Sequence, residues 1–306
     1  LLINGDTAYE YYNFVRGTAD LYTSAINRAG TLLAGKTNVY DMIVPTSMGI
    51  TAPDNVVATI NTSDQKKAIN YMYSGMGKSG VKTVSIYDTL KARRNDYIFF
   101  RTDHHWKPEA AFFAWQALTD ELEERYGLAA DPALTDPANW DTRVLEHFFL
   151  GSQGKRVGSL YAGADDITLY TPKFDSELTY SCPAYGFTRT GPFETSVCFP
   201  ERVAQQDWFN GNPYTYYAGG DYPIATITNH KNPDGPRVVL LRDSFACALT
   251  PFLALSCSEL TTIDLRYFEG DLLDTIAGLE PDIALTLYAA STTRLDNLFQ
   301  YEHTEE

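Results

Sequence analysis

Two short polar stretches of the sequence carry side chains that could do chemistry together. The first is RTDHHWKPEAA, residues 101–111, and the second is VVLLRDSFA, residues 238–246, which places a serine after an apolar run. A serine hydroxyl is a weak nucleophile until a histidine accepts its proton, and a carboxylate usually holds that histidine in one tautomer. We therefore predict a triad in which Ser244 is the nucleophile, His105 the general base and Asp103 its orienting group.

The two supporting groups of this triad can come from a single loop. Residues two apart in extended backbone point to the same side, so Asp103 and His105 are expected to face one way together. His104 is then expected to face the other way, as packing or hydrogen-bonding support. A serine between a strand and a helix has an exposed hydroxyl beside the unpaired N–H groups of the first helical turn, an arrangement that suits acyl transfer.

Structural roles are also open for each of these residues. Serine and aspartate are favoured at helix N-caps, so Ser244 could cap one helix and Asp103 another. Trp106 could be an anchor in the core rather than a substrate platform. The sequence alone leaves these roles open beside the catalytic one.

A metal site is a third interpretation of the same residues. Asp103, His104, His105 and Asp243 are residue types that bind metals in metallo-phosphoesterases. Such sites hold two metals with several further acidic motifs, which the sequence lacks. We predict neither a metal nor a cofactor.

The elements that must position these residues alternate between helix and strand. Apolar residues at helical spacing, and short runs of β-branched and aromatic residues, distinguish the two types. The expected helices are 18–35, 63–77 with Ser63 as its cap, 107–126, 244–256 and 271–280. The expected strands lie within 39–46, 81–90, 96–100, 237–243, 259–268 and 281–289. Both polar stretches thus fall at strand-to-helix junctions, and the pattern predicts an α/β fold with a largely parallel sheet covered on both faces.

Residues from about 128 to 236 differ in composition from the rest of the chain. They are rich in Gly, Pro, Tyr and Asp and alternate as strands do, so we expect a β-rich insertion within one domain spanning residues 1–306. Its aromatic residues suit either a surface for sugar rings or a buried cluster that stiffens the insertion. They are Trp208, Tyr214, Tyr216, Tyr217 and Tyr222.

Charge and cysteine content restrict the partners and the compartment. The formal net charge is −15 and no basic run is present, so we expect no nucleic-acid partner. The longest apolar run, residues 244–258, is too short to cross a bilayer and contains Pro251. The first residue is not Met, so we expect that a processed chain begins here and that any anchor or export signal precedes it. A disulfide between Cys182 and Cys198 would suit an oxidising compartment, with free buried thiols as the alternative.

At these motifs the sequence resembles the DHHW protein family, a branch of the SGNH-like esterases and O-acetyltransferases, and is similar to the catalytic domain of the alginate O-acetyltransferases. The matching stretches are YIFFRTDHHWKPEAAFFAWQAL (97–118), VGSLYA (157–162) and VVLLRDSFACALTPFLA (238–254), with looser matches at INGDTAYEYY (3–12) and DMIVPTS (41–47). The resemblance implies a three-layer SGNH hydrolase-like fold and, carried over by position, a triad of Asp103, His105 and Ser244.

The resemblance also implies where the sequence departs from ordinary SGNH enzymes. The acid and histidine precede the serine here, as in the alginate enzymes, and the separate Gly and Asn blocks that complete the ordinary oxyanion hole have no clear match. The candidates for oxyanion donors are the backbone N–H groups of Ser244 and Phe245. Arg266 could be a side-chain donor, a substrate contact or part of a surface ion pair, and His104 is a further candidate for an oxyanion or substrate contact.

The function implied is a serine-dependent O-acetyltransferase or esterase that acts on acyl groups of an extracellular or cell-envelope polysaccharide. Such a protein would lie outside the cytoplasm, either secreted or anchored through a preceding N-terminal segment, and could receive acyl groups from a membrane-bound donor partner. The alternative is a non-catalytic carbohydrate-binding or envelope scaffold protein that retains the fold.

Overall fold

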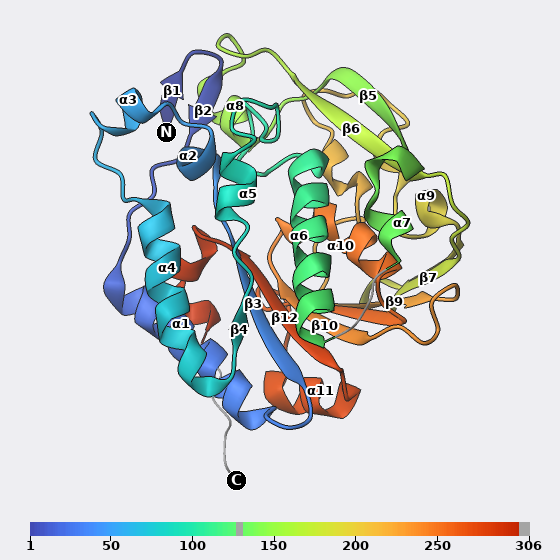
Figure 1. Cartoon of the computed structure of the whole chain (residues 1–306). Coiled ribbons are helices and arrows are strands. Elements are labelled where there is room, and N and C mark those ends of the chain that lie inside the picture. Colours follow the sequence, from blue (N-terminus) through green and yellow to red (C-terminus); the bar gives the residue numbers. More distant parts are fainter. Residues whose placement is uncertain (127–130, 300–306) are drawn as a thin grey trace.

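In a computed structural model, which describes residues 1–126 and 131–299, the chain forms an α/β fold around an eight-stranded sheet (Figure 1). Five adjacent strands are parallel, and three antiparallel strands continue the sheet from one edge. In spatial order the strands are β4 (Lys82–Thr83), β3 (Asn38–Val44), β12 (Ile283–Ala289), β10 (Arg237–Arg242), β11 (Glu259–Asp264), β9 (Ile224–Asn229), β7 (Leu178–Cys182) and β8 (Phe187–Gly191). The predicted α/β fold class with a mostly parallel sheet is confirmed.

Two small antiparallel sheets lie outside this main sheet. One pairs β1 (Leu2–Asn4) with β2 (Thr7–Tyr9), and the other pairs β5 (Trp140–Phe149) with β6 (Asp165–Pro172). The described helices are α1 (Arg16–Leu32), α2 (Ser47–Ile50), α3 (Asp54–Val57), α4 (Gln65–Met76), α5 (Tyr87–Lys91), α6 (Pro108–Tyr126), α7 (Pro132–Thr135), α8 (Ser152–Val157), α9 (Phe193–Ser196), α10 (Ala246–Leu255) and α11 (Leu272–Leu279). None of them is long and apolar enough to span a membrane.

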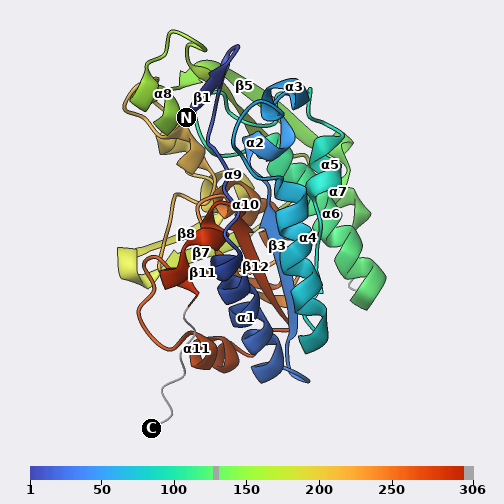
Figure 2. The same ribbon diagram turned by 90° about the vertical axis from the view of Figure 1, so that its left-hand side faces the viewer.

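Helices cover both faces of the parallel strands. Figure 2 shows α4 and α6 on one side of β3, and α1 and α11 on the other. From β10 the chain passes through α10 to β11 and then returns through α11 to β12 on the far side of β10. Because parallel crossovers are right-handed, this reversal of direction places α10 and α11 on opposite faces, and α10 packs on α6. Strand β12 is consequently buried along its whole length.

Two of the predicted local features are wrong. The cap of α4 is Asp64, which accepts a hydrogen bond from the Lys67 N–H (3.0 Å), whereas the Ser63 hydroxyl accepts one from the Phe14 N–H. The run 96–100 is not a strand of the sheet; within it, Phe99 forms an isolated antiparallel bridge with Trp106. The polar stretch is therefore a closed loop that folds back on itself, not the end of a parallel strand.

The described part of the predicted insertion, residues 131–236, contributes strands to the main sheet. Strand β9 pairs with the edge of β11, and β7 and β8 continue outward from it. Residues 128–130, where the insertion was expected to begin, lie outside the described residues. The alternation along these strands thus reflects antiparallel pairing with one face toward the core.

The expected disulfide between Cys182 and Cys198 is absent, since all four cysteines are free and buried. The two residues have different surroundings. The Cys182 thiol donates to the Ile224 carbonyl (3.4 Å), while Cys198 forms a backbone bridge with Tyr217. The alternative of free buried thiols is the correct one.

Candidate active site

The predicted nucleophile lies at the carboxyl end of a parallel strand. Ser244 follows β10 by two residues and precedes α10 by two, and its side chain is half-buried. This is the edge of an open parallel sheet where ligands ordinarily bind. His105, 139 residues earlier in the chain, reaches the same point from the loop between Phe99 and Trp106.

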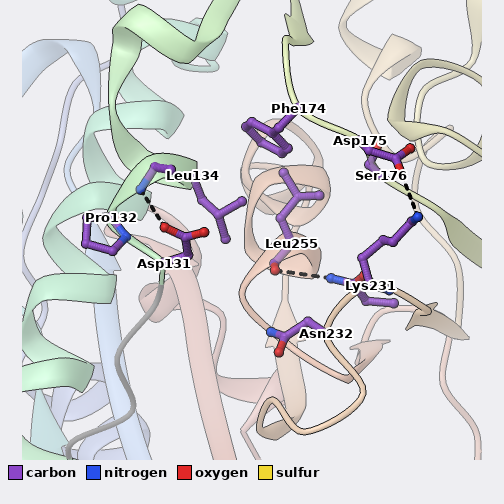
Figure 3. Close-up of a pocket in the computed structure, with 11 residues that line it drawn as sticks. Asp131, Pro132, Leu134, Phe174, Asp175, Ser176, Lys231, Asn232 and Leu255 are labelled. Carbon is purple, nitrogen blue, oxygen red and sulfur yellow. Dashed lines mark hydrogen bonds and ion pairs between the residues drawn. The ribbon is translucent and has the colours of Figure 1, made fainter.

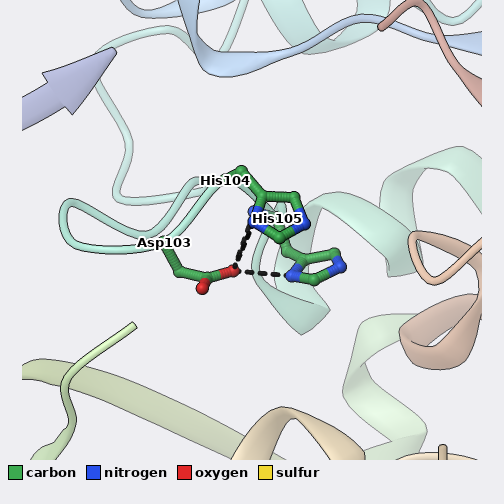
Figure 4. Close-up of side chains that lie close together, drawn as sticks. All are labelled: Asp103, His104 and His105. Carbon is green, nitrogen blue, oxygen red and sulfur yellow. Dashed lines mark hydrogen bonds and ion pairs between the residues drawn. The ribbon is translucent and has the colours of Figure 1, made fainter. Parts of the chain in front are cut away.

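The three predicted side chains form one continuous chain of hydrogen bonds. His105 Nε2 lies 2.8 Å from Ser244 Oγ, and His105 Nδ1 lies 2.6 Å from Asp103 Oδ1 (Figure 4 shows the second contact). Burial alone would raise the pKa of Asp103, but the charge and hydrogen bond of His105 outweigh it and hold that pKa well below its usual range. An ionised Asp103 fixes the tautomer with hydrogen on Nδ1, which leaves Nε2 free to accept the serine proton.

Asp103 is held by the start of α8 as well as by its own loop. Its Oδ1 also accepts the His105 N–H (3.0 Å), and its Oδ2 accepts the Ser152 N–H (2.8 Å). The preceding Gly151 N–H donates to Thr102 Oγ1 (2.9 Å). A Cβ on Gly151 would lie 2.2 Å from Asp103 Cβ and 2.6 Å from the Thr102 carbonyl oxygen, so this approach requires glycine. Sequence reasoning did not identify Gly151 or Ser152, which lie just outside the matched motifs.

A second carboxylate, that of Asp165, also binds the loop that carries Asp103. Asp165, at the start of β6, accepts the Thr102 N–H (2.8 Å), the Thr102 hydroxyl (2.5 Å) and the Arg101 N–H (2.9 Å), and it also accepts the Tyr97 hydroxyl. Burial raises the pKa of Asp165, and these four donors oppose that shift. The segment just before Asp103 is therefore held by the start of β6 as well as by the start of α8.

The turn that carries Ser244 is organised by the carboxylate of Asp243. Its Oδ1 accepts the Phe245 N–H (2.9 Å), and its Oδ2 accepts the Ala289 N–H (2.9 Å) and the Thr292 hydroxyl (2.6 Å). The Phe245 N–H is therefore already engaged and is a poor oxyanion donor, contrary to expectation. Among the described residues, the structure gives the Ser244 N–H no partner, so this group is the better candidate.

Comparisons with known proteins identify the family of this chain. The family model described as "DHHW protein" matches residues 1–261. The chain belongs to the DHHW family. Comparison with curated protein sequences gives no match.

Three solved structures share the fold of this DHHW protein. A DHHW family protein from Eubacterium siraeum has a TM-score of 0.77 at 22% identity, over 97% of this chain and 92% of the other. PatB1 from Bacillus cereus has a TM-score of 0.78 at 20% identity, over 99% of each chain. The O-acetyltransferase domain of Pseudomonas putida AlgJ has a TM-score of 0.50 at 14% identity, over 93% of this chain and 87% of the other.

His104 does not face away from the other two residues of its loop, as the extended-backbone argument predicted. The loop bends, so the His104 ring lies on that of His105 with centroids 3.8 Å apart, and its Nδ1 lies 3.0 Å from Ser152 Oγ (Figure 4 shows the two rings). Burial lowers the pKa of His104 to about 4, and the neighbouring His105 ring acts in the same direction. At neutral pH His104 is therefore an uncharged neighbour of His105.

Arg266 is engaged in ion pairs at the edge of the site. Its guanidinium contacts both oxygens of Asp264 (2.9 and 2.6 Å) and lies 3.0 Å from Asp221 Oδ2. Asp221 in turn pairs with the buried Arg242 (2.7 Å). The ion-pair role considered for Arg266 is thus present, and its part in oxyanion or substrate binding stays a prediction.

The metal interpretation loses one of its four ligands in the structure. The ligand atoms of Asp103, His104 and His105 lie within 4.8 Å of one another. The Asp243 carboxylate instead accepts hydrogen bonds from Phe245, from Ala289 at the end of β12 and from Thr292. A metal at the remaining three would have to displace the hydrogen bond between His105 and Asp103.

The aromatic residues of the insertion divide into two groups. The four tyrosines, Tyr214, Tyr216, Tyr217 and Tyr222, are all at least 93% buried, as the cluster interpretation predicts. Trp208 is 43% exposed and Phe209 50% exposed, and their rings meet edge to face. The Trp208 carbonyl accepts the Leu150 N–H (2.7 Å), which attaches this exposed pair to the segment that contacts Asp103.

A pocket of about 400 Å³ lies elsewhere, beside α7 and β9 (Figure 3). Its lining includes Leu134, Phe174 and Leu255, together with Lys231, which pairs with Asp175. Asn229, also in the lining, donates to the carbonyls of residues 254 and 255. The pocket shares no residue with the triad.

Proposed function

We propose that this DHHW protein is a serine-dependent O-acetyltransferase or esterase that acts through an acyl-enzyme. The observation that carries the proposal is the unbroken chain of hydrogen bonds from Asp103 through His105 to Ser244. It combines a nucleophile, a base within reach of the nucleophile's proton and a carboxylate on the far nitrogen of that base, which is the arrangement that acyl transfer requires.

The first half-reaction acylates the serine. His105 Nε2 accepts the Ser244 proton as Oγ attacks the acyl carbonyl, and the negative charge that develops on the carbonyl oxygen is met by the Ser244 N–H. As the tetrahedral intermediate collapses, His105 gives the proton to the departing oxygen of the donor, and the acyl group remains on Oγ. Asp103 stays ionised throughout and stabilises the imidazolium that forms between the two proton transfers.

The second half-reaction transfers the acyl group to an acceptor. His105 accepts a proton from an incoming hydroxyl, whose oxygen attacks the acyl-enzyme, and then returns that proton to Ser244 Oγ as the ester bond to serine breaks. A sugar hydroxyl as acceptor makes the protein a transferase, and water makes it an esterase.

For the substrate we propose an acylated carbohydrate outside the cytoplasm. The support is the similarity of fold to the AlgJ O-acetyltransferase domain and the exposed aromatic pair Trp208 and Phe209, whose faces suit the apolar faces of sugar rings. A membrane-bound partner that delivers acyl groups belongs to the same proposal and follows from the family resemblance.

The proposal is tested with p-nitrophenyl acetate as acyl donor. The protein should release p-nitrophenol, Ser244→Ala should abolish the release, and Ser74→Ala, an exposed serine on α4, should leave it unchanged. Adding an oligosaccharide and detecting its acetylated product by mass spectrometry separates transfer from hydrolysis. Equal activity in Ser244→Ala would refute the assignment. Failure of a fluorophosphonate probe to label Ser244 in protein that binds glycans would favour the non-catalytic scaffold.

A further inference from the structure

Tyr214 contacts both the general base and the nucleophile turn, which come from distant parts of the chain. It lies in a short 3₁₀ helix of the β-rich insertion, Pro213–Tyr216, and is 2% exposed. We propose that Tyr214 is a positioning residue that fixes the His105 ring relative to Ser244. The proposal rests on the proposed function and adds a residue that no sequence motif marks.

The ring of Tyr214 covers one face of the general base. Its centroid lies 4.2 Å from that of His105, and the two planes differ by 21°, so the rings are stacked. His104 lies 3.8 Å from the same imidazole. Two rings this close cannot occupy the same face, so His104 and Tyr214 cover opposite faces of His105. The imidazole is thereby restrained against rotation out of the plane that points Nε2 at Ser244.

The hydroxyl of Tyr214 holds the other partner. It donates to the carbonyls of Phe245 (2.9 Å) and Ser244 (3.1 Å), at the turn that presents the nucleophile. The Phe245 carbonyl also accepts the Trp106 indole N–H (2.8 Å), from the residue after His105. The base loop and the nucleophile turn are therefore joined at one carbonyl, once directly and once through Tyr214.

This geometry predicts separable contributions from the two ends of the side chain. Tyr214→Phe keeps the stacked ring and removes the hydroxyl, so kcat for p-nitrophenyl acetate should fall about three- to tenfold, the value of one neutral hydrogen bond. Tyr214→Leu removes both, so kcat should fall about 100-fold, as expected for displacement of a catalytic group by about 1 Å. KM should stay within about twofold in both variants, because Tyr214 is buried and does not meet the substrate.

The matched control is Tyr217→Phe. Tyr217 is fully buried in the same segment, and its hydroxyl donates to the Thr168 carbonyl (2.7 Å), away from the triad. Rates are expressed per active site labelled by a fluorophosphonate, so that loss of folded protein is not read as loss of catalysis. The low-field proton resonance of His105 Nδ1–H, which reports its bond to Asp103, should broaden in Tyr214→Leu and stay sharp in Tyr217→Phe.

The outcomes distinguish this inference from the proposed function. A wild-type protein that neither hydrolyses the ester nor is labelled contradicts the proposed function itself. Wild-type activity together with full kcat per labelled site in both Tyr214 variants, and an unchanged resonance in Tyr214→Leu, overturns the role of Tyr214. If Tyr214→Leu does not fold, kcat per labelled site in Tyr214→Phe decides the question alone.

Discussion

Replacing Gly151 by alanine should disable the triad without changing any of its members. The added Cβ would lie 2.2 Å from Asp103 Cβ, 2.7 Å from Asp103 Cα and 2.6 Å from the Thr102 carbonyl oxygen, and two of these atoms belong to backbone that cannot rotate away. Ordinary contact begins near 3.4 Å, and the shortfall from 3.4 to 2.2 Å means that one segment must retreat by about 1.2 Å.

That retreat breaks the contact that holds the carboxylate of Asp103. The bond from the Ser152 N–H to Asp103 Oδ2 is 2.8 Å long, and lengthening by the same amount takes it to about 4 Å, beyond hydrogen-bonding range. We expect the free energy of unfolding to fall by about 2–6 kcal/mol, because overpacking costs about 1–3 kcal/mol and an acceptor left without its donor costs about 1–3 kcal/mol. We expect kcat to fall about 100-fold, because a displacement of this size moves the group that orients His105.

Urea unfolding and p-nitrophenyl acetate kinetics, with active sites counted by fluorophosphonate labelling, measure both effects. The control is Gly278→Ala in α11, where an added Cβ meets no atom within 4 Å. That variant should keep full activity and gain up to about 1 kcal/mol, because alanine favours helix. If Gly151→Ala keeps both wild-type stability and wild-type kcat, the close approach of α8 does not position Asp103 and the reasoning is wrong.

Three further predictions concern other parts of the molecule. Burial raises the pKa of Asp41 to about 7 from its ordinary 3.8, so between these pH values the folded state retains a proton that the unfolded state has lost. The free energy of unfolding should therefore fall as pH rises through this window, by up to about 4 kcal/mol. Urea midpoints at pH 4 and pH 8 should differ in the wild type and converge in Asp41→Asn. Trp208→Ala should reduce acyl transfer to a polysaccharide while leaving hydrolysis of p-nitrophenyl acetate unchanged, whereas Tyr185→Ala, which removes a more exposed aromatic ring between β7 and β8, should change neither. Because Cys182 and Cys198 are free, reductant should not alter the urea midpoint, and thiol titration of unfolded protein without reductant should find all four cysteines; a lower count would show a disulfide.

Local patterns predicted the parallel half of the fold and failed where the partner of a segment was distant or unusual. Apolar runs such as those of β10 and β12 are buried on both faces, and their length identifies them as strands. The run 96–100 is also largely apolar and is equally buried at residues 98–100, yet only Phe99 makes a β-bridge, with Trp106 seven residues later. The apolar composition of these segments correctly indicates that they are buried. It does not indicate whether a segment pairs with a neighbouring strand, which is what distinguishes β10 and β12 from the run 96–100.

The candidate site shows the same division. Ser244, His105 and Asp103 could be proposed from the sequence because the chemistry of a triad depends on residue type. Few other roles require a serine, a histidine and an aspartate together. The predicted orientation of His104 was wrong because the backbone is not extended here: the Asp103 carboxylate accepts the His105 N–H, as it does in a bent loop. Tyr214 could be assigned only to a tyrosine cluster, since stacking on an imidazole leaves no trace in the sequence.

Two contacts that hold the predicted triad come from the β-rich insertion, which contains none of its three residues. Asp103, His105 and Ser244 all lie outside residues 131–236, but the donor to Asp103 Oδ2 is Ser152, and the ring stacked on His105 is that of Tyr214. The same segment supplies the strands that continue the sheet from β11. Removing it would therefore leave the Asp103 carboxylate without one of its donors and the His105 imidazole exposed on one face. The alternating, aromatic-rich composition that first distinguished these residues suits a segment that both extends a sheet and covers the proposed general base.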